Sequence, residues 1–511
     1  MAGYHQPRPP RFGTMALLAC LLVSAPPVSA APMPDSKSAQ AMDAPSEQKV
    51  ESRHSITVNG RVIDYQATAG TLILKDQAGK PAARLFYTAY VADREKGAPE
   101  RPLTFFYNGG PGSSSIWLHM ASFGPVRVPV GVDRPAGAAR SAPNSQTLLD
   151  VTDMIFLDAV GTGYSRTFDP ADNKNFYGND QDAAAFAQAI RRYVDLNGRW
   201  RAPKYLFGES YGTTRSAMLS YRLTDSGMPL DGVILMSSIL NFAQRAPGLD
   251  RMAINSLPTY AATAWYHGRV DKGAGLEAHV EKARQFAQGP YAAALARGHH
   301  IAQEERDTIA AQLAAMTGLP ASYIAQSDLY VPADRFRKEL LRGEGRITGG
   351  FDTRFTGMEA DRSAEAARGD PAEDAIAGSV ITNFKAYLAQ DLGYRGDMEY
   401  IVSSSDKLFP AWDWSHKPPV GPRQNALADV AVDLDAAMRR NPRMRVLSLN
   451  GYYDLSTPFF ATEFDLAHMY LPKELLGNLV IRNYPSGHML YLDDDTRSAV
   501  AQDVRQFLRK Q

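Results

Sequence analysis

Short apolar runs alternate with amphipathic stretches between residues 55 and 242. Residues 103–107, 154–157, 205–207 and 232–236 are each short and apolar, as buried strands are. Strand-like runs at 70–75 and 83–91 flank a polar turn at 76–80, which predicts a hairpin. Residues 180–196 carry apolar side chains near helical spacing. Strands that alternate with helices indicate a mostly parallel sheet covered on both faces.

The pattern changes after residue 242. Residues 243–422 show helical stretches and loops without clear buried strands, and the polar, Ala-rich stretch 359–378 predicts a mobile loop. Apolar positions at Leu427, Val430, Leu434 and Met438 then predict a helix, strands follow at 446–449 and 479–481, and a last helix is expected from about 496 to 508. The sequence predicts one α/β domain, made of residues 51–242 and 423–511, with an inserted, mainly helical cap at 243–422.

The first 30 residues have the pattern of a signal peptide. Arg8 and Arg11 precede an apolar run at 15–23, and small residues at 28–30 offer a cleavage site before Ala31. The run is shorter than the roughly 20 residues that a membrane span needs. Residues 31–50 are rich in Pro, Ser, Ala and Asp and predict a disordered lead-in. We therefore expect a periplasmic or secreted protein.

Cys20 is the only cysteine, and it lies inside the apolar run. Lipid attachment there is disfavoured, because Leu18 is bulky for such a site and the run continues past Cys20. The mature chain would then contain no cysteine, and core burial must hold its fold without disulfides.

The balance of positive and negative residues disfavours two classes of binding partner. The chain has 55 Lys plus Arg and 55 Asp plus Glu, so no basic field favours nucleic acid or an anionic membrane. The ten histidines show no metal-ligand spacing, and no cofactor or metal is expected. Oligomeric state leaves no signal in the sequence.

Residues 208–212 read Gly-Glu-Ser-Tyr-Gly between an apolar strand and a helix-like stretch. This G-x-S-x-G context is that of a nucleophile elbow, in which a tight turn exposes Ser210 above the sheet. A serine needs a base, and in α/β hydrolases the acid and then the histidine follow the serine along the chain. Asp454 and His488 each come shortly after a predicted strand, in that order. They are the candidate acid and base.

An oxyanion needs fixed N–H donors. The amide of Tyr211, directly after Ser210, is one candidate. The glycine-rich segment 108–112, Asn-Gly-Gly-Pro-Gly, follows an earlier strand and offers a second donor at Gly110.

Several of these motifs together resemble the serine carboxypeptidase family, in a form typical of an exported bacterial protein. Residues 108–114 (NGGPGSS), 157–165 (LDAVGTGYS), 208–212 (GESYG), 450–454 (NGYYD) and 487–489 (GHM) are similar to its motifs in order. The resemblance implies an α/β-hydrolase fold and removal of C-terminal residues from peptides with a free C-terminus. It further implies that Asn108, the Gly109 amide and Glu209 hold the substrate's terminal carboxylate.

The chain departs from the family pattern at three positions. Ser113 replaces the usual cysteine, Phe106 replaces a tryptophan, and Ser122 stands where a second glutamate often partners the first. Glu209 can donate to a carboxylate only when it is protonated, so one carboxyl pKa must rise.

Other activities remain open on the sequence alone. A prolyl-aminopeptidase-like enzyme would read an N-terminal amine, and an acyltransferase or esterase could use the same scaffold. A binding protein with a relic site is a non-enzymatic alternative. Side-chain preference at the scissile bond is not readable from the sequence, because the pockets lie partly in the cap.

Overall fold

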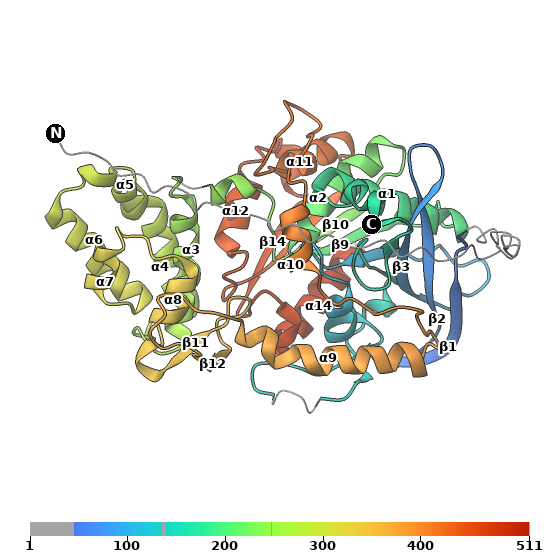
Figure 1. Cartoon of the computed structure of the whole chain (residues 1–511), viewed down its shortest axis with the longest axis horizontal. Coiled ribbons are helices and arrows are strands. Elements are labelled where there is room, and N and C mark those ends of the chain that lie inside the picture. The colour runs from blue at the N-terminus through green and yellow to red at the C-terminus, as the bar shows by residue number, and fades with distance from the viewer. Residues whose placement is uncertain (1–44, 135–138, 247, 510–511) are drawn as a thin grey trace, which may run out of the picture. The chain divides into compact units, whose positions relative to one another are not determined.

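The computed structural model describes residues 45–134, 139–246 and 248–509, with a ten-stranded mixed sheet at their centre (Figure 1). The predicted signal segment, Cys20 and residues 31–44 lie outside the described residues. The strand order is β1-β2-β3-β7-β4-β9-β10-β13-β14, and β8 pairs with β3.

The sheet has an antiparallel edge and a parallel remainder. The antiparallel strands are β1 (Lys49–Val58), β2 (Arg61–Lys75), β3 (Pro81–Ala92) and β8 (Arg166–Thr167). The parallel strands are β7 (Asp153–Leu157), β4 (Leu103–Tyr107), β9 (Lys204–Glu209), β10 (Gly232–Met236), β13 (Arg445–Gly451) and β14 (Leu479–Tyr484). The predicted hairpin and the mostly parallel sheet are confirmed.

Helices cover both faces of this sheet, and each face has its own apolar core. One core contains residues of α1 (Asn179–Leu196), α2 (Tyr211–Asp225) and α11 (Ala431–Arg440). The other contains residues of η1 (Trp117–Phe123), α9 (Pro371–Gln390) and α14 (Asp494–Arg509). Phe105 and Phe106 of β4 fall in different cores, as alternating side chains of a strand must. Every residue of β4, β7, β9 and β10 is buried, which explains their uninterrupted apolar sequences.

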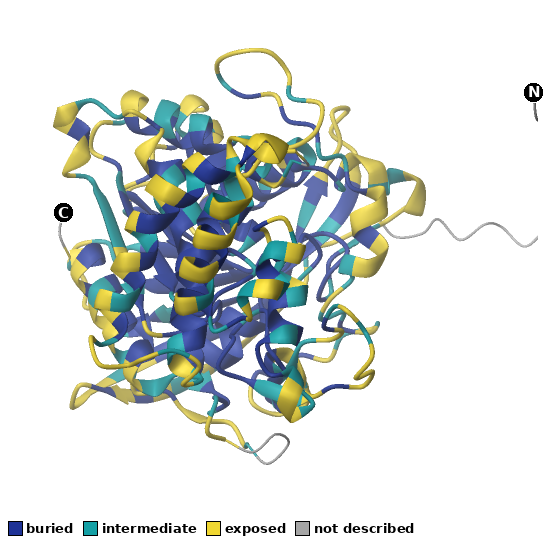
Figure 2. Cartoon of the chain, turned by 90° about the vertical axis from the view of Figure 1, so that its left-hand side faces the viewer, coloured by how far each residue is buried: buried dark blue, intermediate teal, exposed yellow. Residues whose placement is uncertain are grey.

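The segment between β10 and β13 contains a helical lobe, α3 to α8, with its own core. Tyr453, Leu455 and Phe459, which follow β13, complete that core. Figure 2 shows these helices with exposed residues on their outer side and buried residues beneath. The lobe's helices are α3 (Arg251–Tyr266), α4 (Leu276–Phe286), α5 (Ala292–Leu295), α6 (Gln303–Thr317), α7 (Ala321–Gln326) and α8 (Ala333–Glu339).

The rest of this segment returns to the sheet. A short ribbon, β11 (Arg346–Thr348) with β12 (Thr356–Met358), precedes α9, whose buried side chains pack in the same core as η1. The short helices α10 (Ser405–Leu408), α12 (Phe459–Ala467) and α13 (Lys473–Leu476) complete the set.

Three sequence expectations need correction. Residues 371–378 are not a loop but the start of α9, where the Asp370 carboxylate accepts from the Ala372 amide as an N-cap. The helix expected to include Leu427 begins only at Ala431, because Leu427 has a positive φ of 52° and is 41% exposed. The disordered lead-in expected at 31–50 also ends earlier than residue 50. The Glu47 carboxylate accepts hydrogen bonds from the Ile73 amide and from Arg192, and β1 begins at Lys49.

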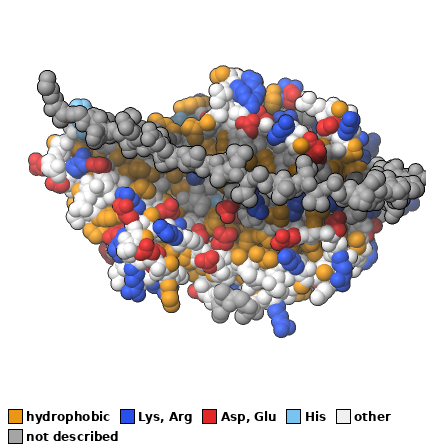
Figure 3. All heavy atoms as spheres, viewed as in Figure 1, with side chains coloured by type: hydrophobic (Ala, Val, Ile, Leu, Met, Phe, Trp, Pro, Cys, Tyr) orange, Lys and Arg blue, Asp and Glu red, His pale blue; other side chains and the backbone are white. Residues whose placement is uncertain are grey.

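Charges of both signs are interspersed on the face shown in Figure 3. Within the described residues 45–134, 139–246 and 248–509, no helix is both long and apolar enough to cross a membrane.

Candidate active site

The turn between β9 and α2 carries Ser210 in a strained conformation. Ser210 has φ 61° and ψ −129°, a region that residues other than glycine rarely adopt, and its amide donates to the Met236 carbonyl (3.0 Å). The flanking glycines are required by close packing. A Cβ on Gly208 would lie 2.2 Å from the Gly212 carbonyl oxygen, and one on Gly212 would lie 2.8 Å from the Tyr107 oxygen. The G-x-S-x-G pattern thus encodes this turn.

Asp454 and His488 come together from the loops after β13 and β14. The His488 Nδ1 atom lies 2.7 Å from the Asp454 Oδ2 atom, and both side chains are buried. Asp454 Oδ1 accepts from the amides of Ser456 (2.8 Å) and Thr457 (2.9 Å), and the Thr457 hydroxyl donates to Oδ2 (2.7 Å). Burial alone would lower the pKa of His488, but the charge and hydrogen bond of Asp454 raise it above its ordinary value. Asp454 therefore fixes the ring and favours an imidazolium.

Two further groups hold the His488 backbone and ring. The Ser237 hydroxyl donates to the His488 carbonyl (2.5 Å), and the His488 amide donates to the Phe351 carbonyl (2.6 Å). The Phe351 ring lies 5.1 Å from the His488 ring, centroid to centroid. Phe351 belongs to the segment between the lobe and α9, so the predicted insertion supports the base directly.

The glycine-rich loop after β4 lies against the start of α2. A Cβ on Gly109 would be 2.3 Å from the Tyr211 nitrogen, so the two backbones meet without room for a side chain. Gly110 has φ 101°, which glycine adopts without strain. Tyr211 is the first residue of α2, and its amide has no acceptor within the helix. Gly109 thus packs against the Tyr211 amide, and Gly110, the next residue, lines the same cleft as Ser210 and Tyr211.

Asp158 supports this loop from the adjacent strand end. Its Oδ1 atom accepts from both the amide (2.7 Å) and the hydroxyl (2.8 Å) of Ser115. The 157–165 motif thus positions the glycine-rich loop.

Glu209 is buried beside the nucleophile and accepts from Tyr491. The Tyr491 hydroxyl lies 3.1 Å and 3.0 Å from the two Glu209 oxygens. Burial raises the pKa of Glu209 to about 7, against the opposing effects of the His488 charge and of hydrogen bonds from Tyr491 and Asn108. The Asn108 Oδ1 atom accepts from the Leu118 amide (3.1 Å), which leaves the amide NH₂ as its donor. Near neutral pH, Glu209 therefore has a substantial protonated fraction.

The three departures from the family pattern lie in different surroundings. The Phe106 ring stacks between Phe156 and Phe207, each 4.9 Å away, within one core of the sheet. Ser122 is fully buried in η1 and is not among the residues that line the cleft described below. Ser113 does line that cleft.

A cleft of about 980 Å³ opens over Ser210 and collects nearly all the predicted site residues. Asn108, Gly109, Gly110, Glu209, Ser210, Tyr211 and His488 line it, while Asp454 lies behind His488. The sequence did not identify Tyr491, Thr457 or Phe351. Tyr491 lies three residues after His488 and Thr457 three after Asp454, and this spacing was the only available signal.

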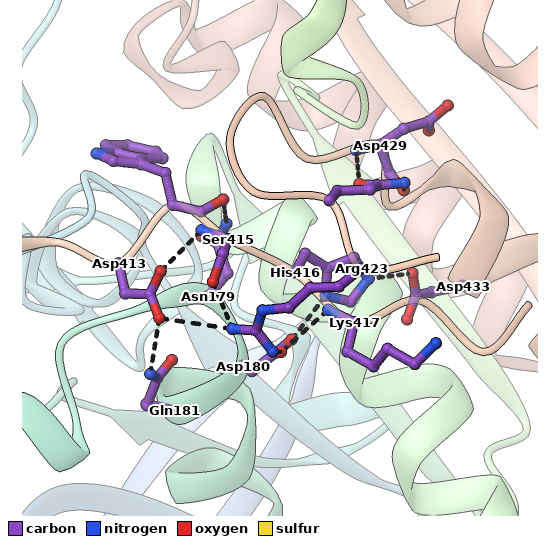
Figure 4. A network of polar contacts seen from close by, with 12 residues as sticks. Asn179, Asp180, Gln181, Asp413, Ser415, His416, Lys417, Arg423, Asp429 and Asp433 are labelled. Atoms are coloured by element: carbon purple, nitrogen blue, oxygen red, sulfur yellow. Dashed lines mark hydrogen bonds and ion pairs between the residues drawn. The ribbon is translucent and has the colours of Figure 1, made fainter. Parts of the chain in front are cut away.

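Part of the cleft wall comes from residues 409–416, which an ionic clamp ties to the domain (Figure 4). His416 lies between two carboxylates, with Nδ1 2.6 Å from Asp180 and Nε2 2.8 Å from Asp433. Burial alone would lower the pKa of His416, but these two hydrogen-bonded carboxylates raise it to about 9. The clamp joins the wall segment to the first turn of α1 and to α11.

The same first turn of α1 also contacts Tyr211, the residue after Ser210. The Asn179 Oδ1 atom accepts from the Tyr211 hydroxyl (2.9 Å) and from the Trp412 indole (3.1 Å), and its Nδ2 donates to the Trp414 carbonyl (2.8 Å). Trp414 lines the cleft. The wall segment and the residue after the nucleophile are thus held by one asparagine.

Comparison with known proteins relates the chain to one family. The sequence model of a family described as serine carboxypeptidase matches residues 63–313, just under half of the chain. The pheromone-processing carboxypeptidase KEX1 of Cryptococcus gattii is 22% identical over 265 residues, which cover 50% of this chain and 36% of that protein. A retinoid-inducible serine carboxypeptidase of Rattus norvegicus is 26% identical over 170 residues, covering 32% of this chain and 34% of that protein. The chain thus spans about a third of the length of these relatives.

Among solved structures, KEX1(delta)p, a prohormone-processing carboxypeptidase from Saccharomyces cerevisiae, is similar in fold. Its TM-score is 0.50 at 14% identity, over 86% of this chain and 90% of that one. These findings support the serine carboxypeptidase family and confirm the α/β fold with a mostly parallel central sheet.

Proposed function

We propose that this chain, which the comparisons relate to the serine carboxypeptidase family, is a serine carboxypeptidase that hydrolyses C-terminal residues from peptides. The observation that carries the proposal is Glu209, a buried carboxyl with a raised pKa directly before Ser210, in the same cleft as His488. A carboxyl group that is protonated near neutral pH can donate a hydrogen bond to a substrate carboxylate, which an ionised one would repel.

The chemistry follows from the positions of five groups. Ser210 Oγ attacks the scissile carbonyl while His488 takes its proton, and Asp454 stabilises the imidazolium. The amides of Gly110 and Tyr211 donate to the developing oxyanion. His488 then protonates the leaving amine, and water hydrolyses the acyl-enzyme by the same route.

We assign recognition of the substrate's free C-terminus to the loop after β4 and to the last residue of β9. The Asn108 NH₂ group, the Gly109 amide and protonated Glu209 would each donate to the terminal carboxylate. Tyr491 holds Glu209 from behind. The substrate's last residue is thereby placed over the loop after β4.

An aminopeptidase would need carboxylates that bind a substrate amine. Glu373, Glu399 and Asp406 line the cleft, but Lys385 and Lys407 line it too, so this set favours no amine. Such an enzyme also has no use for a protonated Glu209 beside the nucleophile. An esterase or acyltransferase would use the same three groups as the peptidase.

A mixed peptide library analysed by mass spectrometry after digestion separates these activities. A carboxypeptidase yields ladders shortened at the C-terminus, and an aminopeptidase yields ladders shortened at the N-terminus. Ladders at the N-terminus alone would overturn the proposal.

We further propose export to the periplasm or outside the cell, on the basis of the segment before Ala31, with no lipid attached at Cys20.

A further inference from the structure

The strand order divides the cleft into two sides. The nucleophile follows β9, which lies between β4 and β10. The loop after β4 carries Asn108 and Gly109, and the segment after β10 carries Ile239, Phe242 and Arg245 on the opposite side. If the terminal carboxylate is read on the β4 side, as the proposed function requires, the residue before the scissile bond extends toward the β10 side.

This second side, which we call the β10 wall, is formed by residues that follow β10 and β13. Its lining residues are Ile239, Phe242, Arg245, Ser456 and Thr457. Among these described residues Arg245 alone is charged, so a single cation faces the side chain that precedes the scissile bond.

Arg245 retains most of its hydrogen-bonding capacity. It is the last residue of η4 (Phe242–Arg245), the residue as a whole is exposed, and its Nη2 atom donates to the Ser456 carbonyl (2.5 Å). The surrounding chain partly desolvates the guanidinium and lowers its pKa. It forms no ion pair with the residues that the structure describes. The nearby Asp454 carboxylate already accepts from two amides, a hydroxyl and His488. By contrast, the buried Arg215 is paired with Asp182 (2.6 Å).

The other charged residues that line the cleft do not form a second site for an anionic side chain. Apart from Glu209 and His488 beside Ser210, they lie on α9 and on the segment 399–407, and they have both signs. They are Glu373, Lys385, Glu399, Asp406 and Lys407. Because these residues have both signs, they do not favour one charge in the substrate. Arg245 beside the apolar Ile239 and Phe242, by contrast, suits a substrate side chain with a short apolar stem and an anionic end.

We propose that Arg245 is a specificity-determining residue that makes the enzyme prefer peptides with Glu or Asp before the scissile bond, the penultimate position. The guanidinium donates to the substrate side-chain carboxylate while one N–H remains on the Ser456 carbonyl, and the substrate stem packs on Phe242. This inference rests on the proposed carboxypeptidase activity for its choice of subsite.

The test compares N-acylated dipeptides Glu-Leu, Gln-Leu and Lys-Leu, each with a free C-terminus. Because a charge-assisted hydrogen bond contributes more than a neutral one, the parent enzyme should favour Glu over Gln about tenfold in kcat/KM. Arg245→Met should reduce this ratio to near one, Arg245→Lys should retain part of it, and Arg245→Glu should favour Lys. Lys385→Met, which removes a cleft-lining cation on α9, outside the β10 wall, should leave the Glu/Gln ratio unchanged.

A structural role for Arg245 predicts a different result. If it only tethers Ser456, all three peptides should slow equally in Arg245→Met. An unchanged Glu/Gln ratio in that variant, or a ratio near one in the parent, would overturn the proposal. The labelling rate of Ser210 by diisopropyl fluorophosphate shows whether each variant is folded.

The N-acyl-Glu and N-acyl-Gln ethyl esters separate this inference from the proposed function. Failure to cleave any free-acid peptide would refute the carboxypeptidase. The ester pair would still report the preference, because it needs only Ser210, Asp454 and His488. Equal ester rates in the parent would refute the role of Arg245 alone.

Discussion

At the scale of single residues, Ser210, Asp454 and His488 should act as a unit. Ser210→Ala, His488→Ala and Asp454→Asn should each lower kcat by roughly 10³ or more, because the base, its orienting acid and the nucleophile serve one step. Peptide hydrolysis measured on each purified variant tests this. Near-normal turnover by Ser210→Ala would exclude Ser210 as the nucleophile.

Tyr491 should tune Glu209. Its hydrogen bonds to the Glu209 oxygens favour the ionised carboxylate, so they hold the pKa below the value that burial alone would give. Tyr491→Phe removes them, and the pKa of Glu209 should rise above about 7. Cleavage of a free-acid peptide should then persist to higher pH than in the parent enzyme. An alkaline limit that moves down or stays in place would contradict this role.

The site residues that could be predicted from the sequence are those whose local geometry requires a short motif around them. Ser210 was recognisable because the close contacts at Gly208 and Gly212 require glycine on both sides. Tyr491 and Arg245 were not, because a tyrosine or arginine has no local constraint that marks it. Their positions depend on how distant loops meet over the sheet.

At the scale of elements, the His416 clamp should hold the cleft wall more firmly at low pH than at high pH. The pKa of His416 is raised from 6.5 to about 9 in the folded protein, so the stabilisation is complete below 6.5 and is lost as pH rises through about 9. His416→Gln leaves the buried Asp433 without its paired cation and Asp180 with only the more distant Arg423 (3.7 Å), and it should lower the free energy of unfolding by about 3 kcal/mol near pH 6.

Denaturant unfolding near pH 6 and near pH 10 measures this difference. The penalty of His416→Gln should shrink at the higher pH, where the parent histidine is also neutral. His300→Gln, at an exposed position, is the matched control and should change little at either pH. An equal penalty for His416→Gln at both values would refute the ionic clamp.

Helices and strands whose apolar residues follow one clear pattern were predicted from the sequence, and segments without such a pattern were not. The fully buried strands β4, β7, β9 and β10 were visible as apolar runs. The first turns of α9 were mistaken for a loop, because residues 371–375 read Pro-Ala-Glu-Asp-Ala and lack an apolar stripe. The cleft wall at 409–416 could not be predicted from the sequence, because side-chain hydrogen bonds hold this segment and it has no periodic pattern of apolar residues.

At the scale of the whole molecule, export should remove the first 30 residues. Intact-mass measurement of protein from the cell envelope should give a chain that begins at Ala31, because small residues at 28–30 precede it. Such a chain contains no cysteine, so reducing agents should not change its melting temperature. A diacylglyceryl group on Cys20 would refute this processing.

The central claim is that the enzyme reads the free C-terminus of its substrate through protonated Glu209. The most direct measurement is kcat/KM for one peptide, as free acid and as C-terminal amide, across pH in the parent enzyme and in Glu209→Gln. Hydrolysis of the free acid needs neutral His488 and protonated Glu209, so its profile should be bell-shaped and fall as pH rises through about 7. The amide has no terminal carboxylate and should lose less at high pH.

Glutamine keeps a donor without the charge, so Glu209→Gln should retain free-acid cleavage at high pH better than the parent. Equal cleavage of acid and amide at every pH, in both enzymes, would contradict the account and remove the basis for a carboxypeptidase.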